Sequence, residues 1–157
     1  GLVEKIGVSV YEPTEVTQVM HNYLIDIIQI PLNIIDRRFM VDGCLERLSD
    51  AGIEIHARSI FLQGLLLMKA EDRPRYFEKW SDVLGKFDSW IADNNISRVQ
   101  GALLFVRDLS LIKKIVVGVL NIKQLEEVVA AMTDDSAIPL PEIGVSDQNL
   151  VNPSKWY

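Results

Sequence analysis

The chain has 157 residues, of which 48% are hydrophobic and 24% are charged, and its formal net charge is -6. This composition is typical of one folded domain with a hydrophobic core and excludes a disordered chain. The acidic balance argues against a nucleic-acid partner or an anionic membrane surface, because each of these favours a basic patch.

Targeting and redox signals are sparse. Cys44 is the single cysteine, so no internal disulfide can form, which fits a reducing compartment. No apolar run approaches the roughly 18–20 residues that span a bilayer, and Glu4 and Lys5 interrupt the first apolar stretch, which argues against a signal peptide. We therefore expect a cytoplasmic protein without a membrane partner. Gly1 opens almost directly on a predicted strand, which resembles a cut or a tag remnant.

Four short segments have the pattern of β-strands. Lys5–Val10 alternates between apolar and small or polar residues, and Ile25–Ile30 is an apolar, β-branched run that ends at Pro31. Ile53–Arg58 alternates again, and Ile115–Val119 is the fourth predicted strand.

Helices are predicted after each strand. Pro13 favours a helix start, Gly52 favours a helix end, and Ser97 and Asn121 are expected N-caps. The remaining predicted helices cover 36–50, 74–92, 97–106 and 121–132, and residues 59–73 are predicted as a long loop. We expect residues 1–132 to form the folded unit and residues 133–157, rich in Pro, Asp and Ser, to pack on it as an extended tail.

The order of elements predicts an α/β fold. Strands separated by helices form parallel βαβ units with right-handed crossovers. Four such units make either a small open sheet or half of an eight-unit barrel. Small and polar residues collect at the predicted carboxyl ends of the strands, which is the edge where α/β proteins bind cofactors and substrates.

Four motifs occur in order along the chain: Lys5–Ser9, Asp26–Asn33, Ala57–Leu66, and Val117-Gly118 followed by Asn121 to Glu127. Together they resemble strands five to eight of the aldo/keto reductases, a family of TIM barrels that use NADP(H) or NAD(H). The resemblance covers most of residues 3–132. The tail Asn152–Trp156 is also similar to the end of bacterial members.

The resemblance implies where a cofactor would bind. Ser9 and Gln29 would hold the nicotinamide carboxamide. The pyrophosphate would lie against the loop residues Ser59, Leu62, Gln63, Gly64 and Leu65. The adenosine end would lie against Gly118, Asn121, Gln124 and Glu127. Loop amides and helix N-termini suit phosphate, and a glycine permits close approach of the backbone.

Three positions depart from the family pattern. Val10 stands where asparagine often follows the serine, so one carboxamide contact is not expected. Arg58 stands where many members stack a tyrosine on the nicotinamide, and we retain it among the cofactor-binding residues. Leu120 stands where a basic residue often binds the 2′-phosphate, and Lys123 is the one basic residue nearby. The sequence therefore supports no preference for NADP over NAD.

The family's catalytic aspartate, tyrosine, lysine and histidine lie in its first four strand–helix units, and this sequence has no counterpart for them. The resemblance thus implies the cofactor-side portion of an NAD(P)-dependent oxidoreductase acting on a carbonyl or alcohol, and we expect the isolated chain to be inactive. A non-enzymatic half-barrel assembly module and a binding module for another phosphorylated ligand remain open as alternatives.

The other candidate residues favour structural roles. His21 and Cys44 are expected on helices, and no histidine or cysteine partner lies at metal-ligand spacing. Glu54, His56 and Arg58 share the polar face of one strand, as an interior cluster or as a solvated face. The open edges of a half barrel favour self-association, so we expect a homo-oligomer that covers them.

Overall fold

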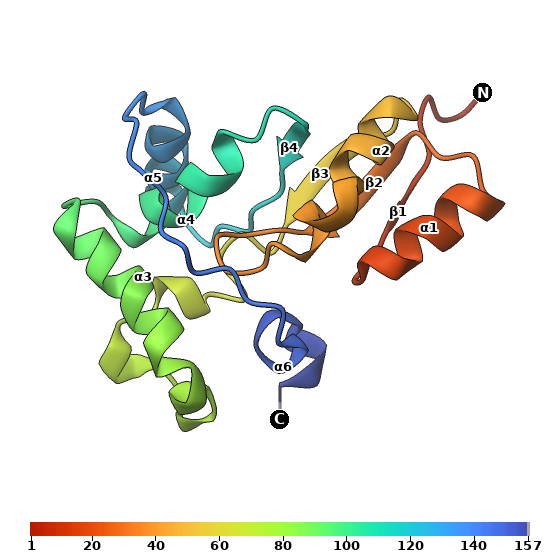
Figure 1. Cartoon of the computed structure of the whole chain (residues 1–157). Helices are drawn as coiled ribbons and strands as arrows, with labels where there is room; N and C mark the ends of the chain where they lie inside the picture. Colours follow the sequence, from red (N-terminus) through yellow and green to blue (C-terminus); the bar gives the residue numbers. More distant parts are fainter. Residues whose placement is uncertain (157) are drawn as a thin grey trace.

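The computed structural model describes residues 1–156, and these contain a four-stranded sheet (Figure 1). The strands are β1 (Gly7–Ser9), β2 (Ile27–Pro31), β3 (Glu54–Arg58) and β4 (Ile112–Ile115), in the spatial order β1-β2-β3-β4. Each strand pairs in parallel with its neighbours. The predicted α/β class with four parallel strands is confirmed.

Helical segments connect the strands and follow the last one. The α-helices are α1 (Pro13–Asn22), α2 (Cys44–Asp50), α3 (Ser81–Asp93), α4 (Arg98–Arg107), α5 (Ile122–Thr133) and α6 (Gln148–Val151). Short 3₁₀ turns cover Arg38–Gly43, Leu65–Leu67, Ala70–Asp72, Arg75–Trp80 and Pro153–Lys155. The predicted N-caps are present, because Ser97 and Asn121 each accept a hydrogen bond from the backbone amide three residues later.

The fourth strand lies earlier than the sequence pattern predicted. It covers Ile112–Ile115, and the chain leaves the sheet after the Val116 amide donates to the Ala57 carbonyl at 2.8 Å. The register against β3 shifts between Ile55 and His56, an irregularity in strand pairing that no local sequence pattern contains. The prediction of a strand over Ile115–Val119 was therefore wrong for all but its first residue.

The predicted helix over residues 36–50 was wrong in its first half. The backbone there forms 3₁₀ turns, and Asp42 and Gly43 adopt left-handed conformations with φ of 56° and 65°. An α-helix cannot pass through such residues, so the regular helix begins at Cys44.

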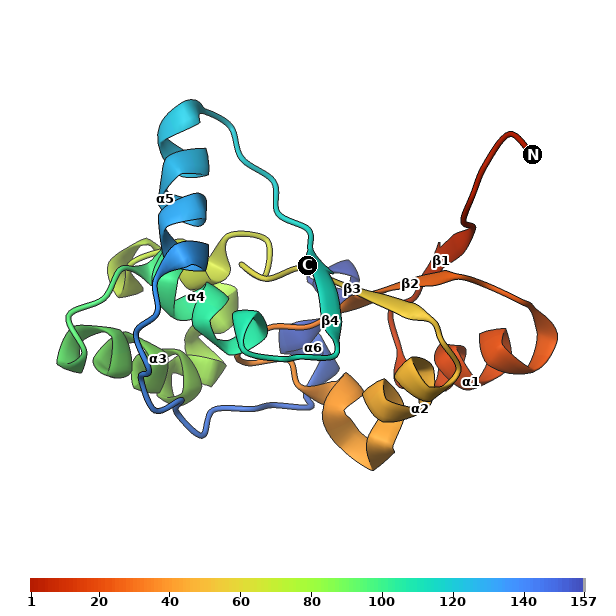
Figure 2. The same ribbon diagram turned by 90° about the horizontal axis from the view of Figure 1, so that it is seen from above.

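The two faces of the sheet have different characters. Ile28, Ile30 and Ile55 are fully buried on the face that α1 and α2 cover (Figure 2). The opposite face carries a polar row in cross-strand register, consisting of Ser9, Gln29, His56 and Lys114. Ser9 and Lys114 are exposed, and Gln29 and His56 are half-buried. The polar face of the sheet is therefore partly open to solvent.

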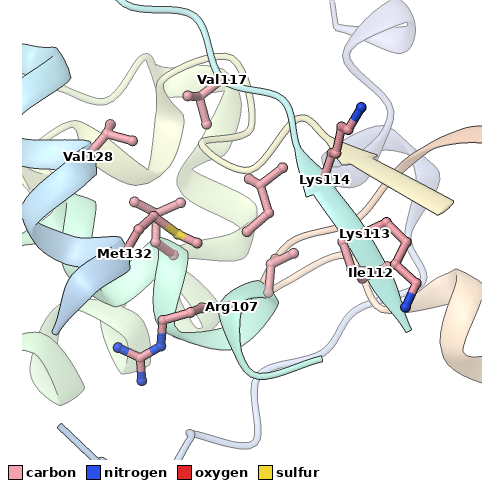
Figure 3. A pocket seen from close by; sticks show the side chains of 10 residues that line it. Arg107, Ile112, Lys113, Lys114, Val117, Val128 and Met132 are labelled. Carbon is pink, nitrogen blue, oxygen red and sulfur yellow. The ribbon is translucent and has the colours of Figure 1, made fainter. Parts of the chain in front are cut away.

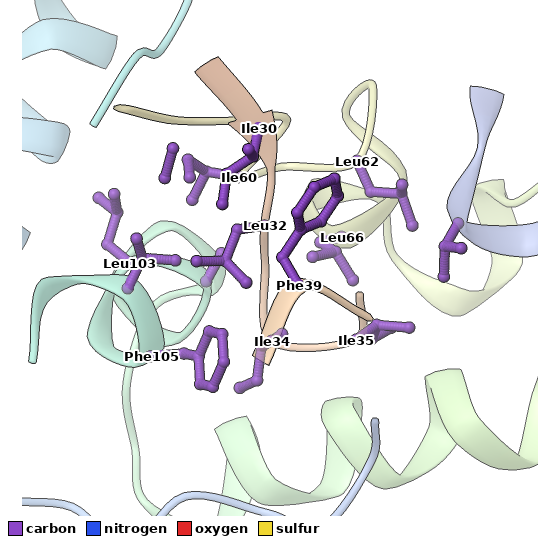
Figure 4. Packing of buried hydrophobic residues seen from close by; sticks show 14 of the residues in the cluster. Ile30, Leu32, Ile34, Ile35, Phe39, Ile60, Leu62, Leu66, Leu103 and Phe105 are labelled. Carbon is purple, nitrogen blue, oxygen red and sulfur yellow. The ribbon is translucent and has the colours of Figure 1, made fainter. Parts of the chain in front are cut away.

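The core continues beyond the carboxyl end of β2. Figure 4 shows Leu32 and Ile34 beside Phe105 of α4, with Phe39 between Leu62 and Ile35. All of these side chains are at most 3% exposed. The loop that follows β3 is thus fixed to the centre of the protein through its own apolar residues.

The tail after α5 packs on α3 and on the turn before it. The indole Nε1 of Trp90 donates to the Pro139 carbonyl at 2.9 Å, and that of Trp80 donates to Asp147 at 3.0 Å. The ring of Trp156 meets the ring of Phe77 edge-on at 4.8 Å. The tail is not extended throughout, because it contains the short helix α6.

Candidate functional site

A hollow of about 960 Å³ lies beside the carboxyl ends of β3 and β4, next to the first residues of α4 and α5. Its wall contains residues from three segments that are far apart in the sequence. Seven of the residues assigned above to a cofactor line it: Arg58, Ser59, Gln63, Gly64, Gly118, Gln124 and Glu127. The structure therefore gathers most of these residues around one space of the size that small-molecule ligands occupy.

The loop after β3 has an unusual backbone. Ser59, Leu62 and Gln63 have φ values of 60°, 46° and 52°, and Gly64 has a φ of 85°. Left-handed conformations are unfavourable for residues with a Cβ, so this loop stores strain that its surroundings must offset. Hydrogen bonds from the Leu62 amide to the Ser59 carbonyl and from the Gly64 amide to the Phe61 carbonyl, each 2.9 Å long, stabilise the turn.

Asn33 anchors the same loop from the end of β2. Its side chain is fully buried and donates from Nδ2 to the Ser59 carbonyl at 3.0 Å. Its Oδ1 accepts the amides of Ile35 and Asp36 at 3.0 and 2.9 Å. Asn33 belongs to one of the sequence motifs, but no role was predicted for it. A lone polar residue directly after a buried strand was the signal that could have identified it.

Leu62 and Leu65 are buried in the core, with exposed fractions of 0% and 1%. Their side chains cannot reach a ligand in the hollow, and their amides already donate to the carbonyls of Ser59 and Leu62. In the described part of the chain, by contrast, the amides of Phe61 and Gln63 donate to no group. Free amides on a left-handed turn form a concave donor surface of the kind that binds anions.

Arg58 joins the hollow to the polar face of the sheet. Its Nε donates to Ser9 Oγ and its Nη1 donates to Ser59 Oγ, both at 3.1 Å. Its Nη2 donates to the Val10 carbonyl at 3.0 Å, and the guanidinium lies 4.5 Å from the centre of the Tyr11 ring. Ser9 and Gln29 do not line the hollow themselves, but Ser9 is one hydrogen bond away from a residue that does. The sequence analysis missed the contribution of Tyr11.

The segment before α5 forms the opposite wall. Asn121 does not line the hollow, because its side chain caps the helix by accepting the Gln124 amide at 3.0 Å. The Gln124 side chain accepts the Leu120 amide at 2.7 Å. Leu120 itself is 92% exposed and places no charge near the hollow.

Arg98 is a second cation of this hollow that the sequence analysis missed. It lies in the first turn of α4 and pairs with Asp88 at 2.7 Å, while Arg73 pairs with the same carboxylate at 2.6 Å. Burial alone would raise the pKa of Asp88, but the hydrogen bonds from Arg73 and Arg98 outweigh it and hold that pKa below its ordinary value. Because Asp88 is shared by two arginines, the charge of Arg98 is only partly compensated within the protein.

A separate polar cluster occupies the amino-terminal side of the sheet face. Glu54 accepts hydrogen bonds from Lys5 at 2.5 Å and contacts His56 at 2.7 Å, and Lys114 lies 3.6 Å away. The hydrogen bond from Lys5, followed by that from His56, lowers the pKa of Glu54 to about 2. Glu54 thus forms an ion-pair cluster with Lys5 and Lys114 and contacts His56, whereas Arg58 makes its contacts elsewhere.

A smaller hollow of about 230 Å³ lies between β4, α4 and the end of α5 (Figure 3). Val106, Val128 and Met132 contribute apolar walls, and none of the residues assigned to a cofactor lines it. Within residues 1–156, no group of three or more histidine, cysteine or acidic side chains is placed to hold a metal ion. The larger hollow is therefore the candidate site.

None of the helices within residues 1–156 is long and apolar enough to cross a membrane.

The carboxyl ends of parallel strands form the ligand-binding edge of an α/β barrel. This chain has four parallel strands, and its ligand-sized hollow borders the carboxyl ends of β3 and β4. The model of the aldo/keto reductase family matches residues 1–140, and the chain belongs to that family.

Two solved structures share the fold. The aldo-keto reductase AKR11C1 from Bacillus halodurans in its holo form matches with a TM-score of 0.69 and 18% identity, over 83% of this chain and 45% of that chain. Its apo form matches with a TM-score of 0.66 and 19% identity, over 85% and 46% respectively. The chain spans less than half the length of these reductases. A comparison with curated protein sequences gave no match.

Proposed function

We propose that this chain is the cofactor-binding portion of an NAD(P)-dependent oxidoreductase that acts on a carbonyl or an alcohol. The observation that carries the proposal is the single hollow lined by Ser59, Gln63 and Gly64 on one wall and by Gly118, Gln124 and Glu127 on the other. The family resemblance of the sequence assigns these segments to the two ends of one cofactor. Family membership supports the same assignment.

Each part of the site has a matching ligand group. The free amides of Phe61 and Gln63 suit the pyrophosphate, which needs donors without a competing carboxylate. Ser9 and Gln29 offer a hydroxyl and an amide to the nicotinamide carboxamide. Gln124 and Glu127 offer polar groups to the adenosine end. The bound cofactor would supply or accept the hydride, and the residues of this chain would orient it.

We also propose that the chain does not turn over substrate by itself. The acid–base chemistry of the family depends on an aspartate, a tyrosine, a lysine and a histidine that have no counterpart in this sequence. No basic side chain stands at Leu120, so the site would accept NAD and NADP without a strong preference. The cytoplasmic location expected from the sequence stays a prediction.

The open edges of the sheet favour a second copy of the chain as the partner. Apolar residues are exposed beside β1, where Ile6 is 55% exposed, and on α5, where Ile122 and Leu125 are 75% and 47% exposed. Two copies related by a two-fold axis would place β4 of one beside β1 of the other and continue a parallel sheet. Sedimentation velocity over a range of concentrations tests this, and a monomer at every concentration would contradict it.

The proposed function is tested by isothermal titration calorimetry of the whole chain with NADPH, NADH and ADP-ribose. We expect saturable, single-site binding of both dinucleotides, tighter than that of ADP-ribose because Ser9 and Gln29 add contacts to the nicotinamide end. Gln124→Ala should weaken binding, whereas Gln18→Ala, at an exposed position of α1, should not. Absence of binding at millimolar dinucleotide would overturn the proposal. Equal affinity for ADP-ribose would favour a general phosphorylated-ligand module.

A further inference from the structure

We propose that Arg58 makes this site bind the reduced, neutral nicotinamide more tightly than the oxidised, cationic one. The inference rests on the proposed function and adds a redox-state preference to it. It follows from the hydrogen bonds of the Arg58 guanidinium and from the lack of an ion-pair partner for it among the described residues.

The positive charge of Arg58 is not compensated by the protein. Its hydrogen bonds go to the hydroxyls of Ser9 and Ser59 and to the Val10 carbonyl, all of which are uncharged. Among the described residues, no carboxylate lies within ion-pair distance of it. The face of the Tyr11 ring stabilises the cation from one side without neutralising it.

Arg58 differs in this respect from the other cation of the hollow. Arg98 shares the carboxylate of Asp88 with Arg73, so its field is reduced by an ion-pair partner, which Arg58 lacks. Arg58 is half-buried at the carboxyl end of β3, where solvent screens a charge only partly. The hollow therefore has a positive charge without an ion-pair partner at the end nearest Ser9.

The hydrogen bond to Ser9 determines which group of the ligand lies close to the charge of Arg58. Because Arg58 Nε donates to Ser9 Oγ, it occupies an oxygen lone pair and leaves the hydroxyl hydrogen free to donate. The carbonyl oxygen of a nicotinamide carboxamide is a suitable acceptor. The guanidinium would then lie one side-chain oxygen away from the carboxamide, roughly 6 Å from it by two successive hydrogen-bond lengths.

At that separation the redox state of the ring matters. The oxidised nicotinamide ring carries one positive charge, and the addition of a hydride removes it. Arg58 therefore repels the oxidised ring and is indifferent to the charge of the reduced ring. The ring lies beyond the carboxamide, and the repulsion between two like charges roughly 6–9 Å apart in a partly screened site is enough to change a dissociation constant by about tenfold. A phosphate contact, in contrast, would be equal in the two redox states.

The experiment measures dissociation constants of NADH and NAD⁺ by calorimetry for the wild-type chain, Arg58→Met and Arg58→Lys. We expect the wild type to bind NADH about tenfold more tightly than NAD⁺. Arg58→Met keeps a long side chain without the charge, and it should lower that ratio about tenfold, mainly by improving NAD⁺ binding. Arg58→Lys keeps the charge and should retain most of the preference.

Other outcomes overturn the inference in distinguishable ways. An equal loss of affinity for both redox states in Arg58→Met would assign Arg58 to a phosphate. An unchanged ratio would exclude an electrostatic effect on the ring. If the wild type binds neither form, the proposed function fails and the inference fails with it. If Arg58→Met does not fold, the wild-type ratio measured at increasing salt decides, because it must decrease as ions screen the charge.

Discussion

The two walls of the candidate site are built in opposite ways. The loop 59–65 is held from beneath by the buried side chains of Leu62 and Leu65 and by the Asn33 amide. The segment 116–121 has no comparable anchor, and Val116, Val119 and Leu120 are 42%, 37% and 92% exposed. One wall is fixed by the core of the protein, whereas the other is attached at its two ends, through the Val116 amide to β3 and through the cap and first turn of α5.

This difference indicates how much each wall contributes to the free energy of ligand binding. A loop already held in a left-handed conformation loses little entropy when an anion binds to it. The segment 116–121 must lose more, because its main-chain and side-chain positions are not fixed by burial. We therefore expect the wall formed by residues 59–65 to provide most of the affinity and the wall formed by residues 116–121 to provide selectivity.

The largest expected effect is at Asn33. Replacement by alanine leaves the amides of Ile35 and Asp36 without a partner and removes one of the two hydrogen bonds to the Ser59 carbonyl. We expect the free energy of unfolding to decrease by about 2–4 kcal/mol, measured by urea denaturation. Asn22→Ala removes one exposed hydrogen bond to the Gln18 carbonyl and should cost less than about 0.5 kcal/mol. Similar costs for the two variants would show that the loop is not anchored as described.

Substitution of one glycine in each wall compares the backbone conformations of the two walls through their effects on stability. Gly64 has a φ of 85°, so alanine there should cost about 1–2 kcal/mol even though the space around it is open. Gly118 also has open space and no left-handed φ, so alanine there should change stability by less than about 0.5 kcal/mol. Thermal unfolding of both variants measures the difference, and equal effects would contradict the strained-loop description.

The preference between NADPH and NADH should be adjustable in the wall formed by residues 116–121. Leu120→Arg places a cation beside the expected position of the 2′-phosphate and should improve NADPH binding about tenfold relative to NADH. Leu120→Gln lengthens the side chain without charge and should leave the ratio near that of the wild type. Calorimetric titrations of both variants with both cofactors decide, and a gain for NADH instead would place the adenosine end elsewhere.

The smallest effect concerns Glu54, which lies outside the site. Its folded-state pKa of about 2 is below its ordinary value of 4.5, so the stability that it contributes is fully present above that ordinary value. This contribution is lost as the pH falls from about 4.5 towards 2. Glu54→Gln should therefore flatten the loss of stability over this range in acid denaturation. Glu126→Gln, at an exposed position of α5, should leave the profile unchanged.

Local patterns predicted the parts of the fold that depend on neighbouring residues. The β-branched runs and the alternation around Ile28 and Ile55 located the central strands, and Ser97 and Asn121 located two helix starts. The strand near Ile115 was displaced because the register shift beside it arises from pairing with β3, which no local pattern contains. The turn at Asp42 was missed because an aspartate adopts a left-handed conformation at only a minority of positions, and no local pattern distinguishes this one.

The candidate site was predictable as a set of residues but not as a set of contacts. Ser59, Gln63 and Gly118 were named from the sequence, and all of them line the hollow. Asn33 and Arg98 were not assigned to it, because their contribution comes from partners 26 and 10 residues away, Ser59 and Asp88 respectively. Such partnerships depend on how the loop folds back over the core.

The central claim is that a nicotinamide dinucleotide occupies the hollow between these two walls. Its most direct test is the change in backbone amide resonances of the labelled chain as NADPH is added. We predict that the largest shifts fall on residues 59–65 and 116–121, with Phe61 and Gln63 foremost, and that the small hollow around Val106 and Met132 is unaffected. Saturable shifts confined to that small hollow, or none at all, would contradict the account.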